Sequence, residues 1–157
     1  MAKTPMFKIN LDSSIIISHL SGDIHKDDVK AVIEHVSALK TEIFLSLICY
    51  AEVWTGIELL KSKESRKQTI RHFEDIIKAS RIMLVSDNVI IAREAARAQA
   101  KYRQRGGKRE ALIPDFLIAA NAAYYSGRLL TTNPRDFMKS FSKLEVLTPR
   151  SLIQKYE

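Results

Sequence analysis

Four acidic residues stand beside the ends of apolar segments that lie far apart in the chain: Asp12, Glu52, Asp115 and Asp136. Carboxylates held a few Å apart repel one another, so such a cluster requires protons or divalent cations. All-oxygen ligation favours Mg²⁺ or Mn²⁺. Two such ions can activate water and stabilise the leaving oxygen in phosphodiester hydrolysis. If folding brings the acids together, they would therefore form a hydrolytic metal centre.

Each acid also has an ordinary structural interpretation. Asp12 precedes two serines and could cap a helix. Glu52 lies among apolar residues, so we expect it to be paired, protonated or bound to a cation, unless it is exposed in a first helical turn. Asp136 could pair with Arg135 or Lys139 in a turn. If all four acids lie at the same edge of one sheet, a common chemical role is favoured over these separate structural roles.

Segments with strand patterns alternate with segments of helical period. Strands are expected over 7–11, 43–48, 82–85, 129–132 and 144–147. Helices are expected over 13–20, 26–40, 51–60, 64–79, 88–104 and 114–125, and from 149 onward. This order predicts βαβ units, an α/β fold and a parallel sheet. Ligands of such sheets bind at the carboxyl ends of the strands.

Asp115 opens the most apolar of these helices. The helix begins at Pro114, runs to Tyr125 and is apolar nearly all round, so we expect it to be buried. An acid in its first turn would point toward the sheet edge, where the helix dipole favours the ionised form.

Length and composition exclude several classes of protein. The 157 residues predict one domain over 1–157, which is large enough to fold without disulfides or a structural metal. One cysteine, Cys49, permits neither an intrachain disulfide nor a thiolate-rich zinc site. We find no membrane-spanning run or signal peptide, so a cytoplasmic location is expected. The histidines lack metal-ligand spacing, and neither a Gly-x-Ser-x-Gly motif nor a glycine-rich phosphate loop occurs.

The basic excess is confined to part of the chain. Residues 1–60 hold 5 basic and 8 acidic side chains, whereas residues 61–157 hold 20 basic and 10 acidic ones. This asymmetry indicates an anionic partner or a set of solvated helix faces. Because one basic run leads directly into Asp115, we favour RNA contact over a cationic helix end for its five cations: Lys101, Arg103, Arg105, Lys108 and Arg109.

Four segments, taken in order, resemble the PIN-domain family and most closely its VapC-type toxin ribonucleases. Leu11–Ser14 resembles the opening strand with the first acid, and Ala51–Gly56 the segment of the second acid. Ile113–Ala120 is similar to the stretch with the third acid, and Leu130–Phe137 to the Thr-x-Asn-x-x-Asp-Phe segment. The resemblance spans about residues 7–148.

The resemblance implies a Rossmann-like three-layer α/β/α sandwich and a metal-dependent endoribonuclease. In the family pattern, Mg²⁺ or Mn²⁺ would be held by four acids: Asp12, Glu52, Asp115 and Asp136. Thr131 and Asn133 would orient the acids or the substrate. Toxins of this kind belong to type II toxin–antitoxin pairs, usually form homodimers and are inhibited by a cognate antitoxin in the active-site groove. The segment Lys61–Arg81 holds more basic residues than the acid motifs require. It could bind the substrate or the antitoxin, and the sequence does not decide between them.

Three other functions compete with this one. A nuclease of the same fold could process RNA outside a toxin–antitoxin pair. A non-catalytic RNA-binding module would keep the scaffold, although clustered anions facing phosphate argue against it. A phosphoacceptor signalling domain normally needs paired acids on the first strand and a lysine after a late strand. Here Asp12 is followed by Ser13, and residues 131–133 contain no lysine.

Overall fold

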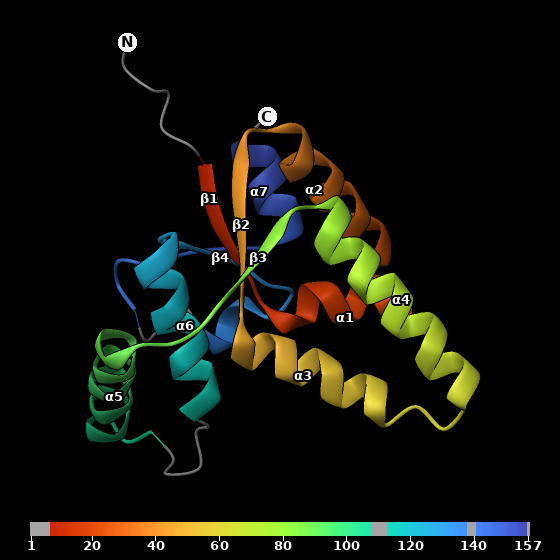
Figure 1. The fold of residues 1–157 in the computed structure, drawn as a ribbon. Coiled ribbons are helices and arrows are strands. Elements are labelled where there is room, and N and C mark those ends of the chain that lie inside the picture. Colours follow the sequence, from red (N-terminus) through yellow and green to blue (C-terminus); the bar gives the residue numbers. More distant parts are fainter. Residues whose placement is uncertain (1–6, 108–112, 138–140, 157) are drawn as a thin grey trace.

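A five-stranded parallel sheet forms the centre of the protein in a computed structural model that describes residues 7–107, 113–137 and 141–156 (Figure 1). The strand order is β3-β2-β1-β4-β5, and every neighbouring pair is parallel. The strands are β1 (Phe7–Leu11), β2 (Thr41–Ser46), β3 (Ile82–Val85), β4 (Arg128–Leu130) and β5 (Glu145–Leu147). All their carboxyl ends therefore meet at one edge of the sheet, as the sequence predicts.

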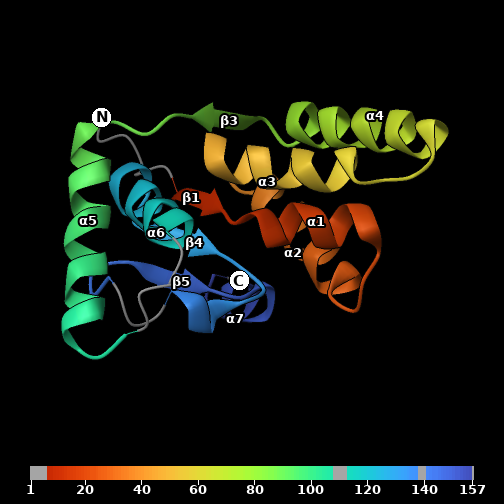
Figure 2. The same cartoon turned by 90° about the horizontal axis from the view of Figure 1, so that it is seen from below.

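Helices cover both faces of the sheet. Figures 1 and 2 show α5 and α6 on one face, and α1, α2, α3, α4 and α7 on the other. The helices are α1 (Ser13–Ser21), α2 (Lys26–Ala38), α3 (Leu47–Glu58), α4 (Lys63–Ala79), α5 (Val89–Gln104), α6 (Ile113–Tyr125) and α7 (Pro149–Lys155), with a short 3₁₀ helix η1 (Pro134–Asp136) after β4. The predicted three-layer α/β/α sandwich is confirmed. None of the helices in the described ranges is long and apolar enough to cross a membrane.

Helix α6 packs against the central strands as its composition predicts. It contacts β1, β2 and β4 on one side and α5 on the other. Its small side chains Ala119, Ala120 and Ala122 are at most 2% exposed, which permits close approach of both neighbours. A small apolar cluster that includes Phe116 and Ile91 joins α6 to α5.

The boundary between β2 and α3 differs from the prediction. We expected a strand over 43–48 and a helix from 51, but β2 ends at Ser46 and α3 begins at Leu47. The Ser46 side chain accepts a hydrogen bond from the Cys49 backbone N–H at 3.2 Å and so caps the helix. A continuous apolar run does not separate a buried strand from the helix that follows it. The correction places Cys49 in a helix rather than in or beside a strand.

Two histidines meet where α1 packs on α4. The ring centroids of His19 and His72 are 5.2 Å apart. Burial lowers the pKa of His19, and the nearby His72, Lys26 and Lys30 lower it further. Within the described ranges, Nδ1 of His19 is buried without a hydrogen-bond partner. The fold therefore favours the neutral form of this imidazole.

Replacing His19 should change the dependence of stability on pH. The pKa of His19 in the folded protein lies below its ordinary value of 6.5, so the folded state binds fewer protons than the unfolded state. As pH falls through 6.5, wild type should lose stability relative to His19→Gln. Denaturant unfolding between about pH 7.5 and about pH 5 measures this difference. His25→Gln, on the loop before α2, serves as the control, and curves of identical shape for wild type and His19→Gln would contradict the prediction.

Candidate metal centre at the carboxyl edge of the sheet

The register of the strands places Asp12 beside Thr131. Leu11 pairs with Leu130, so the next residue of each chain segment emerges at the same point of the sheet edge. The Asp12 backbone N–H donates to the Leu130 carbonyl at 2.9 Å, which continues the ladder by one residue. The Thr131 Oγ1 hydroxyl then donates to Oδ2 of Asp12 at 2.8 Å. Asp12 also occupies the N-cap position of α1, but its side chain makes no capping hydrogen bond there.

The Asp12 carboxyl group is almost fully buried. The residue is 5% exposed, and its Oδ2 accepts a second hydrogen bond from the Ser14 hydroxyl at 2.8 Å. Burial raises the pKa of Asp12 above 3.8, and the hydrogen bonds from Thr131 and Ser14 offset only part of that rise. A neighbouring cation would compensate the buried charge directly.

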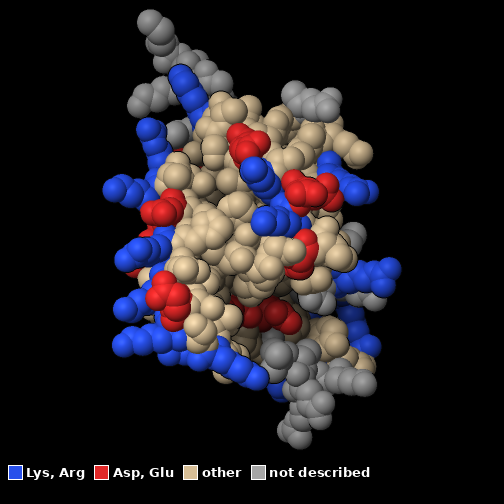
Figure 3. All heavy atoms as spheres, turned by 90° about the vertical axis from the view of Figure 1, so that its right-hand side faces the viewer, with Lys and Arg blue, Asp and Glu red and all other residues tan. Residues whose placement is uncertain are grey.

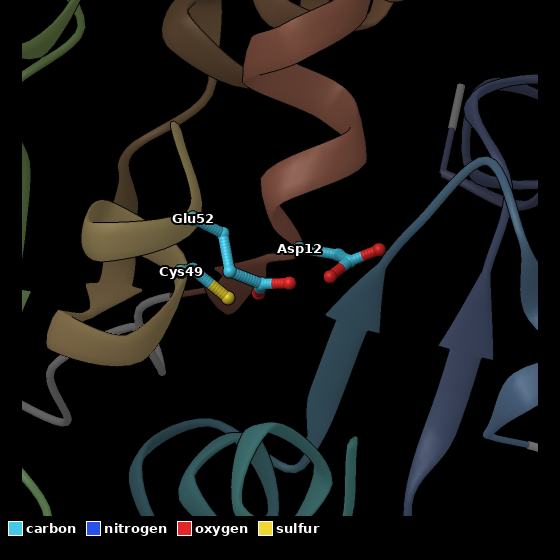
Figure 4. Close-up of side chains that lie close together, drawn as sticks. All are labelled: Asp12, Cys49 and Glu52. Carbon is cyan, nitrogen blue, oxygen red and sulfur yellow. The ribbon is translucent and has the colours of Figure 1, made fainter. Parts of the chain in front are cut away.

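Glu52 and Cys49 approach Asp12 from one turn of α3 (Figure 4). One carboxylate oxygen of each acid and the Cys49 sulfur all lie within 4.8 Å of one another. Glu52 accepts a hydrogen bond from the Ser13 hydroxyl at 3.3 Å. Partial burial raises the pKa of Glu52, the negative charges of Asp12 and Asp115 raise it further, and the Ser13 hydrogen bond opposes them. Asp12 and Asp115 thus both disfavour the ionised form of Glu52.

The surroundings of Glu52 differ from the expectation. Its sequence neighbours are apolar, yet the residue is exposed and its carboxylate borders a hollow. The neighbours Val53 and Cys49 turn into the core instead, because side chains on consecutive helical residues point in different directions. Nor does Glu52 lie in the first turn, since α3 begins at Leu47.

Asp115 is the third predicted acid that the described structure places at this site. It is half-buried in the first turn of α6 and borders the same hollow as Asp12 and Glu52. The hollow has a volume of about 510 Å³. Its lining consists of Asp12, Ser13, Ser14, Ile17, Ser18, Asp23, Ile24, His25, Glu52, Asp115, Thr132, Asn133 and Phe137. Three of the predicted acids, which lie at least 40 residues apart in sequence, thus reach one cavity, and Asp23, which was not predicted, borders it as well.

The segment after β4 supports this cavity. Thr131 is fully buried, and its Oγ1 accepts a hydrogen bond from the Asn133 backbone N–H at 3.0 Å while donating to Asp12. Asn133 is exposed and borders the hollow. Asp136 lies in η1, directly after this segment, and its side chain is outside the described part of the structure.

Three contributors to the centre were not identified as site residues from sequence. Ser13 and Ser14 were considered only as helix-starting residues, but their hydroxyls contact the two acids. Cys49 was placed in or beside a strand. With the helix boundary known, its spacing of three residues from Glu52 would have placed both on one face of α3. Burial and the nearby acids raise the pKa of the Cys49 thiol to about 12, so it is a poor nucleophile at neutral pH.

Basic side chains lie outside the hollow. Lys101 and Arg103 are exposed in the last turn of α5, and Arg105 follows it. Lys108 and Arg109, which we also predicted to contact RNA, lie outside the described residues. The basic segment 61–81 includes α4, on the opposite face of the sheet from α5. Figure 3 shows Lys and Arg side chains as a band along one edge of the face on the α4 side.

The donor set fits a hard divalent cation. Asp12 and Glu52 bring carboxylate oxygens close together, and Asp115 borders the same space. Mg²⁺ and Mn²⁺ prefer oxygen ligands, and their positive charge would offset the burial that raises the pKa of Asp12 and the burial and repulsion that raise the pKa of Glu52. Asp12 and Glu52, with Asp115 nearby, are therefore the candidate ligands.

A three-layer α/β sandwich with carboxylates gathered at the carboxyl edge of its sheet is the class of domain that these observations define. The chain belongs to the PIN domain family, whose sequence model matches residues 9–143. No curated protein sequence matches the chain.

Solved structures show the same fold. VapBC-1 from nontypeable Haemophilus influenzae aligns with a TM-score of 0.71 and 22% identity, over 92% of this chain and 99% of that chain. VapBC2 from Rickettsia felis, bound to a DNA fragment from its promoter, aligns with a TM-score of 0.69 and 20% identity, over 90% and 98%. VapBC-5 from Mycobacterium tuberculosis, a member of a family of toxin–antitoxin systems, aligns with a TM-score of 0.59 and 19% identity, over 90% and 96%.

Removing one acid should stabilise the metal-free protein. The pKa of Glu52 lies above 4.5 in the folded state, so its ionised form costs stability once pH exceeds the folded-state pKa. In EDTA at neutral pH, Glu52→Gln should unfold at a higher temperature than wild type. The gain should disappear as pH falls below 4.5.

Circular dichroism melts across this pH range measure the effect. Glu74→Gln removes the same charge from the exposed face of α4, outside the hollow, and should not reproduce the gain. A lower melting temperature for Glu52→Gln in EDTA would show that the Ser13 hydrogen bond outweighs the repulsion.

Proposed function

We propose that this protein is a metal-dependent endoribonuclease and the VapC-type toxin of a type II toxin–antitoxin pair. The convergence of Asp12, Glu52 and Asp115 on one hollow is the observation that carries the proposal. Membership of the PIN domain family supports it, as does the fold shared with VapBC proteins. We place its action in the cytoplasm, on RNA.

In the proposed reaction, the acids would hold one or two Mg²⁺ or Mn²⁺ ions, which would supply an activated water and charge neutralisation at the leaving oxygen. The water oxygen would form a bond to phosphorus and lose a proton to solvent. The bond from phosphorus to the leaving oxygen would break, and that oxygen would take up a proton from solvent. Asp136 is proposed as the fourth acid of the centre.

The residues around the acids would keep them in place for this chemistry. Thr131 and Ser14 both donate to Oδ2 of Asp12 and so fix the orientation of its carboxyl group. Ser13 orients Glu52. Asn133, exposed at the rim, would contact the substrate or position Asp136. Fixed orientation matters because metal affinity depends on ligands whose hydrogen bonds are already made.

Binding partners follow from the same proposal. The cations predicted to contact RNA phosphates are Lys101, Arg103, Arg105, Lys108 and Arg109. A cognate antitoxin would inhibit the enzyme by occupying the hollow, and the toxin itself would form a homodimer.

Asp115→Asn should abolish RNA cleavage without unfolding the protein. The amide keeps the size of the side chain and loses the negative charge that attracts a cation. Cleavage of a mixed RNA pool in Mg²⁺ or Mn²⁺ should fall by at least about 100-fold, since even residues outside the metal ligands cost 10–100-fold in such sites. EDTA should abolish wild-type cleavage. The melting temperature in metal-free buffer should be unchanged or higher.

Asp75→Asn, an exposed position on α4, is the matched control and should cleave normally. Cleavage by Asp115→Asn at the wild-type rate would contradict the assignment. RNA binding without metal-dependent cleavage by wild type would favour the non-catalytic module instead.

Expression in a bacterial host separates the toxin from other nucleases of this fold. Wild type should arrest growth and Asp115→Asn should not, with rescue by a small protein encoded directly upstream. Metal-dependent cleavage without growth arrest would favour a role in RNA processing.

A further inference from the structure

Two asparagine side chains pair inside the core, between the sheet and α6. Asn10 lies in β1 and is 2% exposed, and Asn121 lies in α6 and is 0% exposed. Nδ2 of Asn10 donates to Oδ1 of Asn121 at 3.0 Å. Burying an amide is unfavourable unless it is hydrogen-bonded, so packing alone does not account for an amide pair at this position.

The pair belongs to a chain of hydrogen bonds that satisfies both amides. Oδ1 of Asn10 accepts from the Ser126 hydroxyl at 2.8 Å. Nδ2 of Asn121 donates to Oδ1 of Asp87 at 2.8 Å. The chain thus joins β1, α6, the turn after α6 and the loop after β3. Because hydrogen bonds are directional, all the bonds of this chain form in one register of α6 on the sheet. They do not all form when the helix is rotated by one residue.

The chain lies close to the candidate metal centre along both elements. Asn10 precedes Asp12 by two residues of extended chain, which is about 7 Å. Asn121 follows Asp115 by six helical residues, which is about 9 Å along the axis. Fixing the pair therefore fixes the position of Asp115 relative to Asp12.

The α6 residues in the main core are one large side chain, Ile118, and two alanines. Ala119 and Ala122 are small and fully or almost fully buried, so they offer little to interlock with the strands. A rotation of α6 by one residue, about 100°, would turn Asp115 away from the hollow.

We propose that Asn10 and Asn121 form a positioning pair that sets the register of α6 on β1 and holds Asp115 at the metal centre. The inference rests on the proposed function, in which Asp115 is a metal ligand. The two residues do not touch the metal or the substrate, and they act through Asp115.

The test is a mutant cycle read by Mn²⁺ affinity of the full chain. In the double variant Asn10→Leu/Asn121→Leu, both buried partners are replaced together by apolar side chains, which is much less costly than removing one. Its melting temperature in EDTA should stay near that of wild type. Its dissociation constant for Mn²⁺, measured by electron paramagnetic resonance of free Mn²⁺, should rise by about tenfold or more.

The decisive comparison repeats the double substitution in Asp115→Asn. If the pair acts through Asp115, the substitution should cause no further loss of Mn²⁺ affinity once that carboxylate is gone. An equal loss in both backgrounds would mean that the pair only supports the fold, because independent effects add. That result would overturn the inference, as would unchanged Mn²⁺ affinity in the double variant.

A second variant changes an exposed member of the chain and leaves both asparagines in place. Asp87→Ala removes the outermost member of the chain from an exposed loop and should weaken Mn²⁺ binding less, again only when Asp115 is present. Tyr125→Phe is the matched control. Its hydroxyl donates to the Ser86 carbonyl at 3.1 Å, so it also ties α6 to the loop after β3, but outside the chain. It should bind Mn²⁺ like wild type.

RNA cleavage is measured separately from the cycle. Wild type that binds Mn²⁺ but cleaves no RNA would contradict the proposed nuclease, and the cycle alone would still decide the positioning pair. Absence of Mn²⁺ binding by wild type would overturn both.

Discussion

The buried carboxyl group of Asp12 is the feature around which the candidate site is organised. Taking a carboxylate out of water is costly, and the raised pKa of Asp12 reflects that cost. The end of β4 and the start of α1 each supply a hydroxyl to it, through Thr131 and Ser14. These bonds satisfy one oxygen but add no positive charge. A divalent cation bound here would offset the remaining cost.

The parallel sheet brings acids from distant parts of the chain to the site of Asp12. Because all strands end at one edge, the helices that follow β1 and β2 and the helix that precedes β4 bring Asp12, Glu52 and Asp115 together. Repulsion between these acids opposes folding, so the rest of the protein must hold them together when no cation is bound. The apolar core contributes the favourable free energy of folding, and the amide pair Asn10–Asn121 sets the register of α6.

The shared fold with VapBC proteins at about one-fifth identity shows how little sequence the scaffold requires. In this chain the scaffold consists of apolar strands that end at one edge, with alanines where α6 meets the sheet. The ionised acids do not favour that scaffold, because burial raises the pKa of Asp12, and burial and two neighbouring acids raise the pKa of Glu52. Their presence in one hollow therefore favours chemistry over a purely structural role. It also argues against RNA binding alone, since anions repel phosphate.

The sequence by itself determined the alternation of strands and helices, the parallel sheet, the buried α6 and the placement of acids at element ends. These features depend on hydrophobic periodicity and on the residues that start and end helices and strands, which are local properties of the sequence. Only the tertiary structure decided where α3 begins, why Glu52 is exposed, and how Cys49, Ser13 and Ser14 join the centre. The pair of Asn10 and Asn121 spans 111 residues of chain. No local pattern predicts such a contact, because a buried amide is recognised only by the partner that folding brings to it.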